Sequence, residues 1–73
     1  PATKIRFGLP KTAFTNIVVY DLLGREIAVL VNEELNPGNY KVDWNGSSFG
    51  SGVYYYTLQA GSFKETKKMV LIK

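Results

Sequence analysis

The residue types that most often perform catalysis are scarce in this sequence. Its 73 residues include no histidine and no cysteine, so the usual general base, thiolate nucleophile and transition-metal ligands are missing. Glu33 and Glu34 are adjacent carboxylates that could do acid–base work, but neighbouring acidic residues in turns are usually only solvated. Ser47, Ser48 and Ser51 have no base partner to activate a hydroxyl. The sequence therefore predicts no catalytic site, no cofactor and no metal ion.

Binding of phosphate, nucleic acid or sugar also has little support. Segment 45–52 is rich in glycine and serine but lacks the GxxxxGK[ST] order of a phosphate-binding loop. A nucleic-acid surface would interleave exposed aromatic rings with lysines, whereas the lysines here gather towards the chain ends. We expect no nucleic-acid partner and no small-molecule substrate. A carbohydrate-binding module stays open as an alternative, and the aromatic residues available for display are Tyr20, Phe49, Tyr55 and Phe63.

Charge is distributed unevenly along the chain, whose formal net charge is +3. The first twelve residues and the last ten each carry +3, and the segment between them carries −3. If the two ends pair as neighbouring strands, one edge of the domain is basic. The simplest explanation of such an edge is a row of solvated lysines, which commonly prevent unwanted strand addition.

The length allows one small domain. A chain of this size buries only about 60% of its unfolded surface, and the aromatic residues, 14% of the total, help to fill its core. No apolar run approaches the roughly 20 residues that span a bilayer. The sequence starts at Pro1 with neither a methionine nor a signal peptide. We expect a piece of a longer chain, with any export signal upstream.

Alternation of apolar and polar residues predicts strands along most of the sequence. Tyr40, Val42 and Trp44, separated by Lys41 and Asp43, give the clearest example. About six or seven such strands, with turns every 8 to 12 residues or so, predict an all-β fold, an immunoglobulin-like antiparallel β-sandwich. The predicted core comprises Ile5, Phe7, Leu9, Ile17, Val19, Ile27, Leu30, Tyr40, Val42, Trp44, Tyr54, Tyr56, Leu58, Met69 and Leu71.

Glycine, proline and asparagine mark the turns. Residues 21–24 place Gly24 where a positive φ is expected, and residues 36–39 (NPGN) have the proline and glycine of a type II turn. The loop 45–52 is long enough to cross between sheets. Residues 60–62 (AGS) supply the turn of a C-terminal β-hairpin.

The spacing Gly52-x-Tyr54-x-Tyr56 is that of a tyrosine corner. In such a corner a tyrosine near the start of a late strand bonds to upstream backbone, two residues before an inward core position. Tyr54 fits the corner, Tyr56 the core position, and Trp44 the buried tryptophan between the sheets. Alternatively, Tyr54 is only an aromatic residue of the strand.

The chain ends in a strand that is both apolar and basic, running from Phe63 to Lys73. Terminal residues fray unless the fold ties them down, so strong β-forming sequence at this end predicts a docked C-terminus. Met69 and Leu71 are expected to face inward. The strand would then complete the sandwich while its lysines remain accessible.

Five segments together resemble a known family. They are 5–10 (IRFGLP), 19–30 (VYDLLGREIAVL), 38–44 (GNYKVDW), 51–56 (SGVYYY) and 66–73 (TKKMVLIK). In this order, and over almost the whole chain, they resemble the type A C-terminal sorting domain of proteins exported by the type IX secretion system. The Asn-Pro-rich lead of that family is represented at most by residues 1–3. The middle segments are also similar to an immunoglobulin-like domain of the flagellar hook-capping protein.

The resemblance implies a transport signal. Residues 1–73 would be a single C-terminal sorting domain of a larger secreted protein. That protein would pass through the periplasm to the cell surface or the medium, often with cleavage at a site before residue 1. The implied partners are the outer-membrane translocon and the shuttle and sortase components of that system, and we expect a monomeric domain. The family's recognition segments carry over onto Gly52, Val53, Tyr54, Lys67, Lys68, Met69, Val70, Leu71, Ile72 and Lys73.

The alternative is a purely structural immunoglobulin-like module, as in a hook cap or an adhesin stalk. A sorting signal must end the natural chain, whereas a stalk module can be followed by further sequence. In that case the terminal strand serves only the core. Charge reversal at Lys67, Lys68 and Lys73 separates the two roles, provided that the variant melts like the parent.

Overall fold

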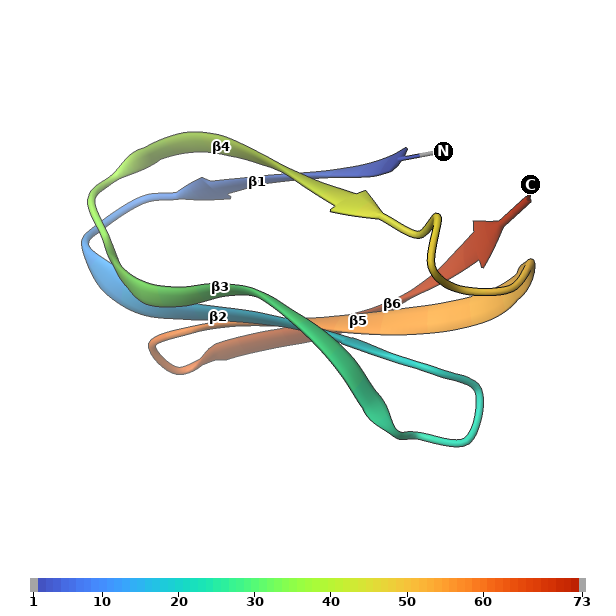
Figure 1. Ribbon diagram of the computed structural model, residues 1–73. Coiled ribbons are helices and arrows are strands. Elements are labelled where there is room, and N and C mark those ends of the chain that lie inside the picture. The colour runs from blue at the N-terminus through green and yellow to red at the C-terminus, as the bar shows by residue number, and fades with distance from the viewer. Residues whose placement is uncertain (1, 73) are drawn as a thin grey trace.

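A computed structural model of the chain describes residues 2–72, whose regular structure is entirely β-strand (Figure 1). Lys73, which we expected in the terminal strand and its recognition segment, lies outside the described residues. Within 2–72 no helix is long and apolar enough to cross a membrane. The strands are β1 (Ala2–Leu9), β2 (Ala13–Tyr20), β3 (Glu26–Leu35), β4 (Gly38–Asn45), β5 (Gly52–Ala60) and β6 (Phe63–Leu71).

The strands form two layers. β1 and β4 make a two-stranded sheet, and the larger sheet has the order β3-β2-β5-β6. All neighbouring strands are antiparallel. Figure 1 shows the small sheet lying over one side of the large one. The predicted all-β antiparallel sandwich is therefore confirmed, with six strands in the described part of the chain.

The basic ends of the chain do not pair with each other. β1 pairs with β4 and β6 pairs with β5, so the expectation that the ends are neighbouring strands is wrong. The two ends lie on the same side of the molecule but in different sheets (Figure 1). Pairing with β4 lets Phe7 stack on Tyr40, with ring centroids 5.3 Å apart and planes 17° apart. The β1–β4 sheet thereby gains a cross-strand aromatic pair.

The core lies between the two sheets. Its cluster of buried side chains comprises Ile5, Ile17, Val19, Trp44, Tyr54, Leu58, Met69 and Leu71. Leu9 is also buried. Five other residues of the predicted core are partly buried and pack against this cluster, namely Phe7, Ile27, Leu30, Val42 and Tyr56. Tyr40 is half-buried beside Phe7.

Two buried side chains were not predicted. Thr15 is completely buried on the inward face of β2, where its hydroxyl donates a hydrogen bond to the carbonyl of Ala13 at 3.2 Å. Val18 is 5% exposed although it lies on the opposite face of β2 from Ile17 and Val19. Neighbouring side chains therefore surround Val18 on the outward face of the large sheet.

β3 does not follow simple alternation, because its pairing with β2 is irregular at two points. The register shifts between Ile17 and Val18 and again between Val19 and Tyr20, which leaves Leu30 and Ile27 without partners in β2. Each such bulge adds one residue to the strand and bends it. As a result, residues of both alternation phases of β3 pack against the core.

The turns match the sequence prediction except at one connection. Gly24 has φ 84°, as expected for the β2–β3 turn, and Gly61 has φ 60° in the β5–β6 turn. Residues 46–51 carry the chain from the small sheet to the large one, as predicted for this loop. Residues 36–39 do not form the expected type II turn, since Gly38 has φ 152° and already begins β4. The reason is topological: β3 and β4 belong to different sheets, so this short segment must cross between layers.

Candidate functional site

The β5–β6 hairpin contains all the described residues of the predicted recognition segments except Ile72, which directly follows β6. Its register joins Gly52 to Leu71 at the open end and Ala60 to Phe63 at the turn. Gly61 has a positive φ and Ser62 does not, which is the pattern of the type II′ turns that suit two-residue hairpins. Since β6 has no neighbour beyond β5, its other edge is free among the described strands.

Tyr54 anchors the start of this hairpin. Its hydroxyl donates a hydrogen bond to the carbonyl oxygen of Gly50 at 2.6 Å, the contact expected of a tyrosine corner. Its ring packs edge-on against Trp44, with centroids 5.1 Å apart and planes at 64°. Phe49 also packs here, 5.7 Å from Trp44 between ring centroids. Phe49 therefore packs against the core and is only partly exposed, which limits its availability for display.

β6 divides into two halves with different environments. Every residue from 63 to 68 is exposed, whereas Met69 and Leu71 are buried between the sheets. Val70, on the opposite face, is 58% exposed, and Ile72 beyond the strand is 76% exposed. β6 is thus anchored in the core by Met69 and Leu71 near its end, and residues 63–68 before them are exposed to solvent.

The lysines of β6 point to both sides of the sheet. Lys67 lies opposite Tyr56 and Lys68 opposite Tyr55, so the two side chains leave the strand on different faces. Lys67 and Glu65 make an ion pair at 3.7 Å in which both side chains are about half exposed. A pair this exposed contributes little to stability. Most of the positive charge along β6 is therefore directed to solvent.

Gly46 is a sterically constrained position beside the end of β6 that the sequence analysis missed. A methyl group at its Cα would lie 2.6 Å from Cδ2 of Leu71, closer than side-chain carbons approach one another. The backbone of the 46–51 connection therefore lies directly against the side chain that anchors the chain end. The dipeptide Asn45-Gly46 indicated a turn, but nothing in the sequence indicated that the side chain of Leu71 would pack against the Cα atom of Gly46.

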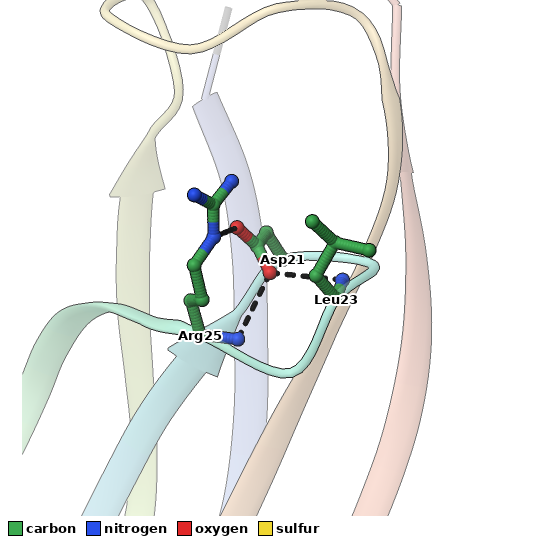
Figure 2. Close-up of polar contacts among 3 residues, drawn as sticks. All are labelled: Asp21, Leu23 and Arg25. Carbon is green, nitrogen blue, oxygen red and sulfur yellow. Dashed lines mark hydrogen bonds and ion pairs between the residues drawn. The ribbon is translucent and has the colours of Figure 1, made fainter.

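Asp21 closes the loop that neighbours the start of β5 (Figure 2). Its Oδ1 accepts hydrogen bonds from the backbone N–H groups of Leu23 and Arg25, each at 2.9 Å. Its Oδ2 accepts from Nε of Arg25 at 2.6 Å. The Arg25 backbone N–H, followed by the guanidinium, lowers the pKa of Asp21 below its ordinary value.

This closed loop holds two large apolar side chains in solvent. Leu22 and Leu23 are 67% and 78% exposed at its tip. A shallow groove runs from them to Gly52 and Val53, at the start of the hairpin. The loop and the candidate recognition hairpin therefore meet at one end of the sandwich.

No arrangement suited to catalysis or metal binding is found in residues 2–72. No cluster of three or more histidine, cysteine, aspartate or glutamate side chains is close enough to hold a metal ion. A hollow lies at the turn end of the hairpin, where Leu9, Pro10, Ala60 and Phe63 give it a mainly apolar lining. It contains no carboxylate, and its one charged lining residue is Lys11.

The aromatic residues considered for sugar binding do not gather on one platform. Phe63 is exposed at the hairpin turn, while Tyr20 and Tyr55 are half-buried neighbours on the outward face of the large sheet. With Phe49 packed against the core, no exposed row of rings remains along the described strands.

Comparison with known proteins gives one match. The family model described as "Secretion system C-terminal sorting domain" matches residues 2–73. Neither the curated proteins nor the solved structures contain a match to this chain.

Proposed function

We propose, from the premise that this chain belongs to the family of secretion system C-terminal sorting domains, that its export machinery recognises the solvent-facing part of β6. Membership makes the domain a type IX sorting signal that directs secretion, in a family without enzymatic activity. The protein that carries it is exported, and the domain interacts with the secretion machinery. The proposal concerns which residues of the domain make that interaction and what kind of partner they contact.

The observation that supports the proposal is the division of β6 into an anchored and a presented part. Met69 and Leu71 hold the strand in the core, while Lys64, Lys67 and Lys68 are exposed along the free edge of the sheet. An ordered free edge can accept a strand from a partner through its backbone groups, and side chains on both faces then add specificity. A partner with acidic side chains would complement this edge.

Within this proposal the recognition surface consists of β6 and the start of β5. Gly52, Val53 and Tyr54 place the hairpin, and residues 67–73 provide its terminal strand. The partners would be the outer-membrane translocon and the shuttle and sortase components of the type IX system. The domain would form the C-terminal part of a larger protein that passes through the periplasm to the cell surface or the medium.

Charge reversal in a secreted fusion tests the proposal. Lys67→Glu combined with Lys68→Glu should leave a reporter fused upstream of this domain in the periplasm, because the two lysines lie on the presented half of β6. Both side chains are exposed, so the melting temperature should stay close to that of the parent. The matched control is Lys4→Glu with Lys11→Glu, which changes the net charge equally at the other end of the chain.

Surface display is the measurement, and the melting temperature is its control. Loss of display in the β6 variant alone, with unchanged melting, supports recognition through this strand. Normal display of a correctly folded β6 variant would contradict the proposal and would mean that the terminal strand has only a structural role.

A further inference from the structure

The outward face of the large sheet is open. The small sheet lies over one side of β3-β2-β5-β6, and no other described element lies over the opposite side (Figure 1). In the registers of β2, β3, β5 and β6, this face carries the residues that alternate with Ile17, Val19, Tyr54 and Leu58 of the core. It is therefore an unpartnered sheet face.

The two edges of this face carry opposite charges. One row across all four strands runs Glu26, Tyr20, Tyr55, Lys68, each residue paired with the next. Glu26 lies on the β3 edge and Lys68 on the β6 edge, and both side chains are exposed. Further along the strands, Glu34 lies on the same side of β3 and Lys64 on the same side of β6. The face thus has an acidic edge and a basic edge.

The middle of the face is apolar and aromatic. Tyr20 and Tyr55 lie opposite each other on neighbouring strands. Val29 and Val70, towards the two edges, are 51% and 58% exposed. On β2, Val18 pairs with Val29 and is already buried by its neighbours. An exposed apolar band of this kind, bordered by charge, is typical of an interaction surface.

We propose that this face binds a second copy of the same chain, with its two-fold axis parallel to the strands. Such an axis turns one sheet over onto the other and places the β3 edge of each copy against the β6 edge of its partner. Glu26 of one copy then faces Lys68 of the other, and Tyr20 faces Tyr55, twice in each dimer. The alternative axis, perpendicular to the strands, would place lysine against lysine and glutamate against glutamate. The charge pattern therefore selects a second copy and its orientation.

The size of the face allows such a dimer but only a weak one. Four strands about 4.8 Å apart, each about 26 Å long, cover about 500 Å² per copy. The total of about 1,000 Å² is at the lower limit for a specific interface. We therefore expect a reversible dimer with a dissociation constant roughly between micromolar and millimolar. This outcome differs from the monomer that the sequence analysis predicted.

Two charge reversals test the arrangement. Glu26→Lys places a lysine at both ends of the Glu26–Lys68 row, and Lys68→Glu places a glutamate at both ends, so in either variant like charges would face each other across the dimer. We expect each to raise the dissociation constant at least about tenfold in sedimentation equilibrium. An equimolar mixture of the two variants should form a heterodimer with an affinity near that of the wild type, because both contacts become complementary again.

Contacts within one copy cannot produce this restoration. Glu26 and Lys68 are separated by two intervening strands in the same chain, about 14 Å, where salt screens most of their attraction. The matched controls are Glu33→Lys and Lys67→Glu, whose side chains leave the same two strands on the opposite face. They should change the dissociation constant by no more than about twofold.

The proposal shares Lys68 with the recognition surface described above, but it does not depend on recognition by the export machinery, because dimerisation is measured with the purified chain alone. A wild-type chain that stays monomeric up to about millimolar concentration overturns it. A dimer that neither reversal weakens, or a mixture that shows no heterodimer, also overturns it. A face that binds anionic lipid vesicles while the chain stays monomeric would assign it to a membrane and reject the second copy.

Discussion

The hydroxyl of Tyr54 donates to the carbonyl oxygen of Gly50 across the loop that joins the two sheets. This bond fixes the residues that precede β5 against the first aromatic ring of that strand. Because Gly52 and Tyr54 of β5 pair with Leu71 and Met69 of β6, the same bond helps to fix the part of β5 against which the end of β6 pairs. A single contact in the loop thus helps to place the chain end.

Replacement of Tyr54 by phenylalanine should destabilise the domain without changing its fold. The variant keeps the ring contact with Trp44 but leaves the Gly50 carbonyl without its donor, a loss of about 1 to 2 kcal/mol. Urea denaturation followed by tryptophan fluorescence measures it. Tyr55→Phe is the control, since Tyr55 lies on the outward face of the same strand. Equal stability of the two variants would contradict a structural role for the hydrogen bond.

Several features of the fold follow from local sequence, and those features were predictable. Alternation indicates strands because successive side chains point to opposite faces. The Gly52-x-Tyr54 spacing indicated the corner, and the turn residues indicated a positive φ at Gly24. Each of these depends on residues that are close together in the chain.

The features that the sequence did not disclose depend on pairing between distant segments. β1 pairs with β4, where Phe7 stacks on Tyr40, and not with the other basic end of the chain. The packing of Phe49 also depends on distant segments. Phe49 lies in a loop and contacts the core only because that loop crosses between the sheets. The contact of Gly46 with Leu71 joins residues at opposite ends of the β4–β6 segment. Strand pairing must be known before any of these contacts can be derived.

Trp44→Ala should remove a large buried side chain from the core and bring so small a domain close to unfolding. Trp44 is 3% exposed and contacts both Phe49 and Tyr54. Truncating a buried tryptophan costs about 3 to 5 kcal/mol, a large share of the stability of a small domain. Thermal unfolding measured by circular dichroism checks this expectation. Trp44→Phe, which keeps an aromatic ring, should lose much less, and an alanine variant that melts within a few degrees of wild type would show that Trp44 is not central to the core.

Gly46→Ala should loosen the anchored end of β6. The new methyl group would meet Cδ2 of Leu71 at 2.6 Å, and Leu71 is itself only 3% exposed and has little room to move. Overpacking of this kind typically costs about 1 to 3 kcal/mol. Hydrogen exchange should speed up most at the amides of β6 near Leu71, and urea denaturation should show the overall loss.

A double-mutant cycle with Leu71→Val tests the cause of that loss. The shorter side chain leaves space for the added methyl group, so the double variant should be more stable than the sum of the single effects predicts. Strict additivity would mean that Gly46 is required for a reason other than its contact with Leu71.

Asp21→Asn should make the stability of the domain less dependent on acid pH. In the folded chain the backbone N–H of Arg25 and then its guanidinium lower the pKa of Asp21 below its ordinary value of 3.8. A carboxyl group whose pKa is lower when folded stabilises the fold above the unfolded pKa, and this contribution disappears as the pH falls through the folded pKa. Wild type should therefore be more stable than Asp21→Asn at neutral pH, and the difference should shrink once the pH drops below about 3.8.

Arg25→Ala separates the two causes of this shift. It removes the guanidinium but keeps the backbone N–H that donates to Asp21 at 2.9 Å, which is the larger influence on the pKa of that carboxyl. The alanine variant should therefore retain most of the acid dependence that Asp21→Asn loses. Chemical denaturation from pH 2 to pH 7 or so covers this window. If Arg25→Ala abolished the dependence as completely as Asp21→Asn, the guanidinium and not the backbone of the turn would hold Asp21 in its ionised form.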